Sequence, residues 1–213
     1  MNIASYIDHT YLKPVGTSED IKKLCEEAKT YSFAAVCVNP TWIGLCKDLL
    51  EGTNVEIATV VGFPLGAMAT ESKVFETKDS IIKGATEIDM VMNIGKFLEG
   101  DYSYVEHDIH QVVSAVNSEK VKVIIETAYL ESDQIVKACK IAVKAGAHYV
   151  KTSTGFASSG AKLEDVKLMR QTVGKGIGVK AAGGIKNKED ALAMIEAGAS
   201  RLGASAGVQI VSS

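Results

Sequence analysis

Two lysines stand at the ends of short β-like runs, and each is followed at once by small residues and glycine. Lys151 lies in His148-Tyr-Val-Lys-Thr-Ser-Thr-Gly155, and Lys180 lies in Gly178-Val-Lys-Ala-Ala-Gly-Gly184. The exit of a strand is where α/β folds commonly build their active sites. The pair therefore offers an amine nucleophile beside a second cation.

The chemistry depends on protonation, because an amine attacks a carbonyl only when it is neutral. A solvated lysine has a pKa of ~10.4, and lowering it to about 7 takes roughly 4 kcal/mol. A second ammonium about 5 Å away supplies ~3 kcal/mol of repulsion at an effective dielectric of ~20, and partial burial adds to it. The alternative is a pair of ordinary solvated lysines, and the pattern alone leaves both interpretations open. Lys122 begins an apolar run with no glycine loop after it, so we interpret it as structural.

Extended runs alternate with segments of helical apolar spacing along the whole chain. Thr17 with Asp20, and Asn187 with Asp190, are typical helix starts. The pairs Gly84-Ala85, Gly146-Ala147 and Gly198-Ala199 are typical left-handed helix stops. Eight strands are predicted, over residues 6–9, 34–38, 57–61, 87–92, 121–126, 149–151, 178–181 and 201–204.

Eight strand-helix units within 213 residues, with only 3 prolines, favour a closed barrel over an open sheet. We therefore expect an α/β protein with a single (β/α)8 TIM barrel that spans residues 1–213. An open sheet would need a glycine fingerprint after its first strand. The one near match, Gly174-Lys-Gly-Ile-Gly178, precedes a strand instead, so dinucleotide binding is disfavoured.

The fourth predicted strand, Glu87-Ile-Asp-Met-Val-Met-Asn93, alternates with period two. Helices cover the outside of a barrel, so its apolar face points outward and Asp89 points inward. A buried carboxylate needs a partner, and the ammonium groups at the mouth are available. We predict that Asp89 and Lys180 form a proton-transfer pair in which Asp89 lies nearer Lys180 than Lys151. The alternative is an ion pair that only fixes the barrel.

Three glycine-containing loops follow the last three strands, at Thr152-Ser-Thr-Gly155, Ala181-Ala-Gly-Gly184 and Gly203-Ala-Ser-Ala-Gly207. Backbone amides without bulky side chains can converge on a phosphate, and barrels often hold one after strands seven and eight. Lys186 adds a local positive charge. The alternative for each loop is a tight turn, but three at one mouth predict a phosphorylated substrate.

The other candidate residues give weaker evidence of a function. His107 and His110 share one helix face, but no third ligand is evident, so a solvated helix is favoured over a metal site. Cys37, near the end of the second strand, lines the pocket or is a small buried thiol. Asp8, His9 and Thr10 form a polar exit from the first strand that contacts substrate hydroxyls or caps a turn.

The composition is ordinary for a globular protein, with 46% hydrophobic and 23% charged residues and a net charge of -3. The sequence has no broad basic patch, so neither a nucleic acid nor an anionic membrane is predicted as a partner. The four cysteines show no C-x-x-C pair, which indicates free thiols in a reducing compartment, and no leader-like or membrane-spanning run is found. We expect a cytoplasmic protein, for which a homodimer stays an open hypothesis.

Read together, these segments resemble the deoxyribose-phosphate aldolase family, and the likeness spans nearly the whole chain in the expected order. The segments are Asp8-His-Thr10, Val36-Cys-Val-Asn-Pro40, Val60-Val-Gly-Phe-Pro-Leu-Gly66, Glu87-Ile-Asp-Met-Val-Met-Asn93, Val150-Lys-Thr-Ser-Thr-Gly-Phe156, Val179-Lys-Ala-Ala-Gly-Gly184 and Arg201-Leu-Gly-Ala-Ser-Ala-Gly207. The resemblance implies a class I aldolase, free of metal and cofactor, that reversibly cleaves 2-deoxy-D-ribose 5-phosphate to acetaldehyde and D-glyceraldehyde 3-phosphate in the breakdown of deoxyribose phosphate.

By that likeness, Lys151 forms the Schiff base while Asp89 and Lys180 move protons. Positions associated with the phosphate are matched by Gly155, Gly183, Gly184 and Ser205, and positions near the carbonyl end by Thr10 and Cys37. Lys186 stands where many relatives have arginine, which replaces a two-pronged contact by a point charge. Two alternatives stay open: a Schiff-base aldolase for another phosphorylated sugar, and a barrel that binds a sugar phosphate without catalysis.

Overall fold

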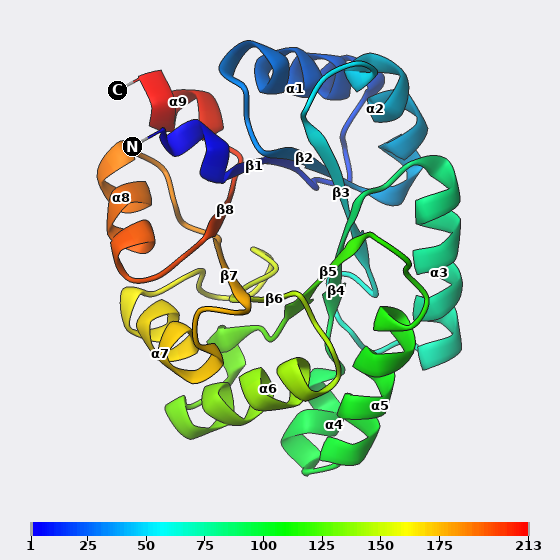
Figure 1. Ribbon diagram of the computed structural model, residues 1–213, viewed down its shortest axis with the longest axis vertical. Coiled ribbons are helices and arrows are strands. Elements are labelled where there is room, and N and C mark those ends of the chain that lie inside the picture. Colours follow the sequence, from blue (N-terminus) through cyan, green and yellow to red (C-terminus); the bar gives the residue numbers. More distant parts are fainter. Residues whose placement is uncertain (1, 213) are drawn as a thin grey trace.

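The computed structural model describes residues 2–212, so Met1 and Ser213, the end residues of the expected domain, lie outside this range. Eight parallel strands close into a barrel in chain order, and β8 pairs with β1 (Figure 1). The (β/α)8 prediction is confirmed. The strands are β1 (Ile7–Tyr11), β2 (Ala35–Val38), β3 (Glu56–Val61), β4 (Glu87–Val91), β5 (Lys120–Ile124), β6 (Tyr149–Lys151), β7 (Gly178–Ala182) and β8 (Arg201–Ala204).

Helices surround the strands on the outside of the ring (Figure 1). Within residues 2–212, none of them is both long and apolar enough to cross a lipid bilayer. The α-helices are α1 (Ser18–Tyr31), α2 (Ile43–Leu50), α3 (Thr70–Lys83), α4 (Ile94–Glu99), α5 (Tyr102–Val113), α6 (Ser132–Lys144), α7 (Leu163–Val173), α8 (Lys188–Glu196) and α9 (Gly207–Ser212), and short 3-10 turns are η1 (Ile3–Tyr6), η2 (Pro40–Trp42) and η3 (Thr127–Tyr129).

Local sequence signals set the helix ends as predicted. Thr17 and Asp20 form a reciprocal capping box at the start of α1. The side chain of Asn187 accepts a hydrogen bond of 2.8 Å from the backbone N–H of Asp190 at the start of α8. The glycines of the three Gly-Ala pairs have left-handed backbone, with φ of +116° at Gly84, +92° at Gly146 and +113° at Gly198.

Strand boundaries differ from the prediction at two places that matter for the site. Tyr6 closes η1, so β1 starts at Ile7 and continues to Tyr11, between β2 and β8. The fifth strand ends at Ile124, whereas the sequence predicted it to run to Glu126. Glu126 has a left-handed backbone with φ of +53°, which no β-strand accommodates. The alternating pattern does not reveal this turn, because the run Val-Ile-Ile-Glu has no glycine or proline.

The two faces of the strands build two different layers. The outer faces carry large apolar side chains that pack against the helices and form the main core. The inner faces of β2 and β3 form a small apolar cluster from Ala35, Cys37, Ala58 and Val60. The rest of the interior carries charged side chains from β1 and from β4 to β8. The barrel interior is therefore divided into an apolar part and an ionic part.

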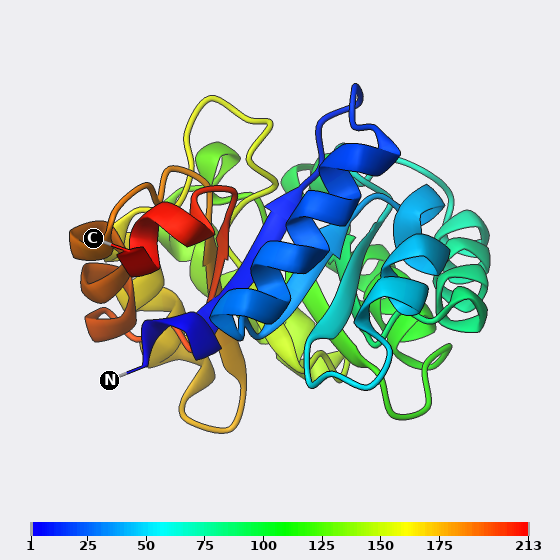
Figure 2. The same ribbon diagram turned by 90° about the horizontal axis from the view of Figure 1, so that it is seen from above.

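The strands run toward one end of the barrel, where the longer connecting loops gather (Figure 2). At the opposite end, η1 leads into β1 and packs against α9 on the outside of the ring (Figures 1 and 2). This orientation brings the segments after β6, β7 and β8 together at the carboxyl end, as the sequence predicted.

Outside the barrel, one fully buried ion pair ties α3 to α5. Lys73 Nζ lies 2.6 Å from Asp108 Oδ2 and donates a hydrogen bond of 3.0 Å to the carbonyl oxygen of Val91. Thr70 Oγ1 donates to the other oxygen of Asp108 at 2.8 Å. Burial lowers the pKa of Lys73, against the opposing effect of Asp108. The pair thus depends on both partners being present.

Replacing Asp108 by asparagine should destabilise the protein by about 3–5 kcal/mol, because it leaves a buried ammonium without a counter-ion. Urea unfolding measures the effect. The matched control is Asp79→Asn, which removes the partner of Lys83 on the same helix, where both side chains are solvent-accessible. The control substitution should lower the free energy of unfolding by less than about 1 kcal/mol. Equal losses in the two variants would contradict this account of the buried pair.

Candidate active site

Asp89 lies at the centre of the ionic part of the barrel. Its Oδ2 atom is 2.8 Å from Lys151 Nζ and 2.7 Å from Lys180 Nζ. Lys151 and Lys180 are register partners on β6 and β7, so both side chains reach the same oxygen from adjacent strands. Because both contacts end on one atom, the two nitrogens can be no farther apart than the sum of the two distances. The predicted meeting of the two lysines and the inward carboxylate is therefore found.

Lys122 completes the set around Asp89. Its Nζ lies 2.6 Å from Asp89 Oδ1 and 2.7 Å from Glu87 Oε2, and its side chain is fully buried. Asp89 and Lys122 are register partners on β4 and β5. This contact fits the structural role expected for Lys122, but it also makes Lys122 a direct neighbour of the site. The alternation Lys-Val-Lys-Val in β5 is the signal that places its side chain inside the ring.

The closure of the ring adds ion pairs that the sequence did not predict. Asp8 on β1 bonds to Lys180 through one oxygen and lies 2.6 Å from Arg201 Nη1 through the other. Arg201 on β8 also forks onto Glu87, with contacts of 3.1 and 3.2 Å. Asp8 is thus neither a substrate contact nor a turn cap. It is a fixed counter-ion for Lys180.

The formal charges of this network do not balance. Within the described residues, the barrel interior holds three carboxyl groups and four basic groups, namely Asp8, Glu87 and Asp89 against Lys122, Lys151, Lys180 and Arg201. Lys122 forms ion pairs with three carboxyl groups and Lys180 with two, whereas Lys151 pairs only with Asp89. A surplus charge is costly in a medium that excludes water. Lys151 is therefore the base that loses its proton most readily.

Burial lowers the pKa of the Lys151 amine, and the positive charge of Lys180 lowers it further, while the Asp89 carboxylate opposes both. Burial is the largest of these causes. From the sequence we expected repulsion by Lys180 to be the larger cause of the lowered pKa, and this ordering is wrong. The physical reason is that Asp89 Oδ2 contacts both ammonium groups and so offsets much of their repulsion.

Lys180 behaves in the opposite way. Burial acts to lower its pKa, but Asp8 and Asp89 outweigh burial and raise the pKa above the usual lysine range. Burial likewise acts to raise the pKa of Asp89, and the three lysines overcome it and hold that pKa well below its usual range. From the sequence we expected Asp89 to lie nearer Lys180 than Lys151, whereas the two distances are nearly equal. The second carboxylate, from Asp8, is what distinguishes the two lysines.

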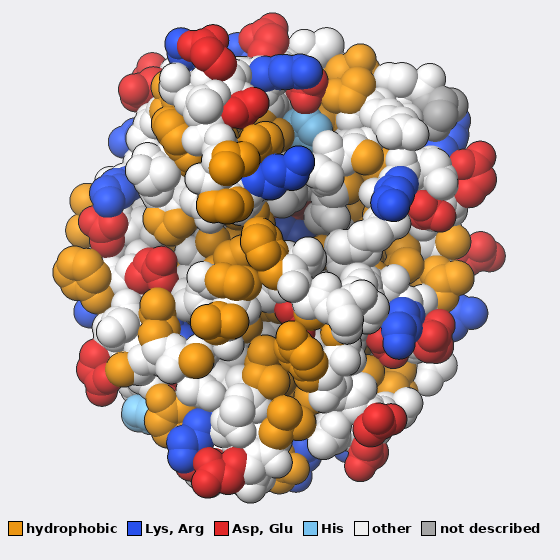
Figure 3. All heavy atoms as spheres, turned by 180° about the vertical axis from the view of Figure 1, so that it is seen from behind, with side chains coloured by type: hydrophobic (Ala, Val, Ile, Leu, Met, Phe, Trp, Pro, Cys, Tyr) orange, Lys and Arg blue, Asp and Glu red, His pale blue; other side chains and the backbone are white. Residues whose placement is uncertain are grey.

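A cavity of about 990 Å³ opens above this network at the carboxyl end of the strands, and Lys151 and Thr154 line it. Figure 3 looks onto this end, where hydrophobic side chains form a band across the middle of the face. Phe156, in the loop after β6, lines the cavity, is exposed and packs edge-to-face on Phe63. Leu65 and Tyr129, in the segments after β3 and β5, are exposed as well. The site therefore has a charged floor beneath a partly apolar rim.

The glycine loops form one wall of this cavity. Gly155, Gly183 and Gly184 line it, and no hydrogen bond to their backbone N–H groups is found within residues 2–212. Gly183 has a φ of +88°, and a Cβ atom on it would come within 2.9 Å of the Cα atom of Gly160. Only glycine fits this close approach of two loops. The free N–H groups are suited to an anion such as a phosphate.

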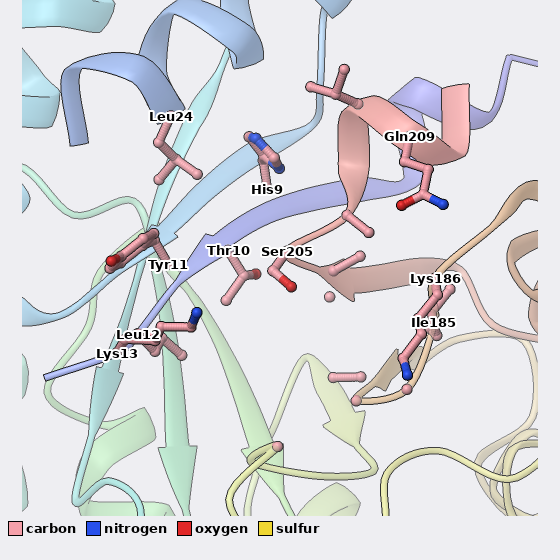
Figure 4. Close-up of a pocket in the computed structure, with 18 of the residues that line it drawn as sticks. His9, Thr10, Tyr11, Leu12, Lys13, Leu24, Ile185, Lys186, Ser205 and Gln209 are labelled. Carbon is pink, nitrogen blue, oxygen red and sulfur yellow. The ribbon is translucent and has the colours of Figure 1, made fainter. Parts of the chain in front are cut away.

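Polar side chains from the first and last strands face the same cavity. Figure 4 shows Thr10 of β1 and Ser205 after β8 in the middle of the pocket, with Lys186 on one side and Lys13 on the other. The hydroxyl group of Thr10 donates a hydrogen bond of 2.8 Å to the carbonyl oxygen of Asp8. Lys186 is exposed at the rim. Thr10, Ser205 and Lys186, which the sequence predicted as binding residues, therefore line one cavity.

Two other candidates lie elsewhere. Cys37 does not line the cavity: it is fully buried in the apolar part of the interior, where burial raises the pKa of its thiol. His107 and His110 lie on α5, and His110 contacts the carbonyl oxygen of Ala145 at 3.4 Å. In the described part of the chain, no three His, Cys, Asp or Glu side chains gather as ligands for a metal ion.

Comparison with known proteins agrees with this geometry. Residues 2–212 match the model of the DeoC/LacD family of aldolases. The chain belongs to this family. A deoxyribose-phosphate aldolase of Bacillus mycoides is 58% identical over 212 residues, which cover 99% of this chain and 95% of that protein. One from Bacillus cytotoxicus is 59% identical with the same coverage.

Solved structures give the same result. A crystal structure described as a putative deoxyribose-phosphate aldolase from Coccidioides immitis has a TM-score of 0.97 at 45% identity, and the match covers 99% of this chain and 85% of that one. The enzyme from Aeropyrum pernix, described as a deoxyribose phosphate aldolase of unique tetrameric structure, has a TM-score of 0.91 at 32% identity, with coverage of 99% and 89%. The present chain is thus an aldolase, and therefore a lyase, built on the expected TIM barrel.

Replacing Lys180 by methionine should make Lys151 less reactive near neutral pH. The repulsion disappears and Asp89 keeps its attraction for Lys151, so the pKa of Lys151 rises and its neutral fraction at pH 7 falls on the order of tenfold or more. The measurement is the rate at which acetaldehyde and cyanoborohydride modify Lys151 as a function of pH, followed by mass spectrometry.

The matched control is Lys167→Met, which removes an exposed lysine from α7 and should leave the pH profile unchanged. Circular dichroism checks that both variants are folded. An unchanged or lower midpoint in the Lys180 variant would refute the charge coupling between the two lysines.

Proposed function

We propose that this chain cleaves 2-deoxy-D-ribose 5-phosphate reversibly to acetaldehyde and D-glyceraldehyde 3-phosphate through a Schiff base on Lys151. The observation that carries the proposal is the position of Lys151. Its amine is the least compensated base of a buried network, and it faces the cavity at the carboxyl end of the barrel. The names of the similar enzymes from Bacillus mycoides and Bacillus cytotoxicus support the choice of substrate.

In the first half of the reaction, the neutral amine of Lys151 attacks the aldehyde carbon C1 of the open-chain sugar. The adduct loses water and becomes an iminium ion. The C3 hydroxyl then gives up its proton, the C2–C3 bond breaks, and its electron pair forms the double bond of an enamine between C1 and C2. D-Glyceraldehyde 3-phosphate departs with the new carbonyl at the former C3.

In the second half, C2 of the enamine takes up a proton, and water hydrolyses the resulting iminium to release acetaldehyde and the free amine. Asp89 and Lys180 carry out these proton transfers. Asp89 contacts the amine of Lys151 directly, and Lys180 contacts the same oxygen of Asp89. Lys180, held charged by Asp8, keeps Asp89 ionised between turnovers. A water molecule in the cavity would link this pair to the C2 and C3 positions.

The phosphate end of the substrate would lie against the wall of the cavity that the glycine loops form, called the glycine wall below. Gly155, Gly183 and Gly184 offer backbone N–H groups, and Ser205 and Lys186 add a hydroxyl group and a positive charge. Thr10, which also lines the cavity, would contact the substrate toward its carbonyl end. Cys37 is given no part in binding, since it is fully buried and does not line the cavity.

Compartment and assembly belong to the same proposal. The four cysteines are free and buried, which fits a reducing cytoplasm. A homo-oligomer is supported by the tetrameric description of the similar structure from Aeropyrum pernix, and a homodimer is the smallest such assembly.

Borohydride reduction in the presence of 2-deoxyribose 5-phosphate should leave one ethyl group on Lys151, because it traps the iminium of acetaldehyde. Peptide mass spectrometry locates the modification. A phosphorylated ketose serves as the control substrate and should leave no adduct. An adduct from the ketose alone would instead indicate an aldolase for another sugar, and an unmodified Lys151 under turnover would refute the mechanism.

Replacing Lys151 by arginine should abolish turnover, by a factor of about 10⁴ or more, while the barrel stays folded, since the guanidinium keeps a positive charge beside Asp89 but cannot form an imine. Release of acetaldehyde in a coupled assay measures turnover. Retained activity would exclude Lys151 as the nucleophile.

A further inference from the structure

A buried carboxyl group beneath the mouth has no role in the chemistry described so far. Glu126 follows β5, is only 2% exposed, and does not line the cavity. Its left-handed backbone, with φ of +53° and ψ of +71°, is unusual for a residue with a side chain. Such a conformation is unfavourable and persists only where the surrounding contacts fix it.

The contacts that fix it lead to the loop after β6. Glu126 Oε2 accepts hydrogen bonds from Thr154, at 2.5 Å from the hydroxyl group and 3.2 Å from the backbone N–H. The Thr154 hydroxyl oxygen in turn accepts a bond of 3.0 Å from the N–H of Phe156. One carboxyl group therefore orients the peptide groups on either side of the Thr154–Gly155 peptide, which carries the N–H of Gly155.

Lys151 is fixed independently of this contact. The next residue, Thr152, donates its backbone N–H to the carbonyl oxygen of Lys180 at 3.0 Å, and its hydroxyl group bonds to both backbone groups of Ala182. The start of the loop is also held by backbone bonds from Ile125 to Lys151 and from Thr127 to Thr152, neither of which uses a side chain of the β5 connection. Only the tip of the loop depends on the carboxyl group of Glu126. Loosening the tip should leave the nucleophile in place.

We propose that Glu126 is a positioning residue for the phosphate end of the substrate. It acts through Thr154 and holds the N–H of Gly155 toward the glycine wall, where Gly183 and Gly184 lie. The proposal rests on the proposed function, because it assumes a phosphorylated substrate at this wall. It assigns to Glu126 a part in substrate affinity and none in the making of the imine.

The test compares two substrates. Glu126→Gln keeps the size of the side chain but makes the acceptor neutral, and it replaces one of the two oxygens that face the N–H of Thr154 by an amide donor. KM for 2-deoxyribose 5-phosphate should therefore rise about tenfold with kcat changed little. The kcat/KM for 2-deoxyribose, which has no phosphate, should stay the same. A role in folding alone would lower both activities together, and that result would overturn the proposal, as would an unchanged KM.

Thr154→Val removes the same hydrogen bond from the other side and keeps the test valid if the first variant folds poorly. It should give the same phosphate-selective rise in KM, and the two changes combined should raise KM by less than the product of the single effects. Thr154→Ser should restore the wild-type KM. The matched control is Glu131→Gln, an exposed carboxyl group farther along the same connection, which should change neither substrate.

Binding of inorganic phosphate, followed by ³¹P NMR, separates this inference from the proposed function. The wild type should bind phosphate about tenfold more tightly than Glu126→Gln, whatever its activity. If the wild type released no acetaldehyde from 2-deoxyribose 5-phosphate, the proposed function would fail, yet weaker phosphate binding by the variant would still support the role of Glu126. Equal binding by the two proteins would refute that role.

Discussion

The site depends on the sharing of one carboxylate, Asp89, by three lysines inside the barrel. Lys122 and Lys180 each have a second carboxyl partner, and Lys151 has none. Four basic groups share three acids, so one positive charge is in excess where water is excluded. Release of the proton from Lys151 removes that excess. The neutral amine needed for attack on a carbonyl is therefore a consequence of the charge count and of burial.

The barrel positions this network through strand register. Asp89 is aligned with Lys122, and Lys151 with Lys180, so the charged side chains converge without any long loop. The connections that follow β6, β7 and β8 are then free to vary above a rigid floor. This arrangement separates two tasks: the floor sets the protonation of the nucleophile, and the loops above it bind the far end of the substrate.

Much of this could be predicted from local sequence patterns. Period-two alternation placed Asp89 inside the ring, and glycine after Lys151 and Lys180 indicated the mouth. The parts that were missed depend on distances across the ring. Asp8 meets Lys180 and Arg201 only because β8 closes onto β1, and no local pattern reports this contact. The turn at Glu126 was missed because it is stabilised by Thr154, a residue of the next loop.

The order of the causes that shift the pKa of Lys151 also escaped the sequence, since it depends on Asp89 touching both lysines. The most direct test of the account is the pKa of the Lys151 amine itself, measured by NMR titration of protein with ¹³C-labelled lysine and assigned with Lys151→Arg. We expect Lys151 to titrate below the ordinary lysine value of ~10.4, while Lys180 stays charged throughout. A pKa for Lys151 at or above that value would contradict the account.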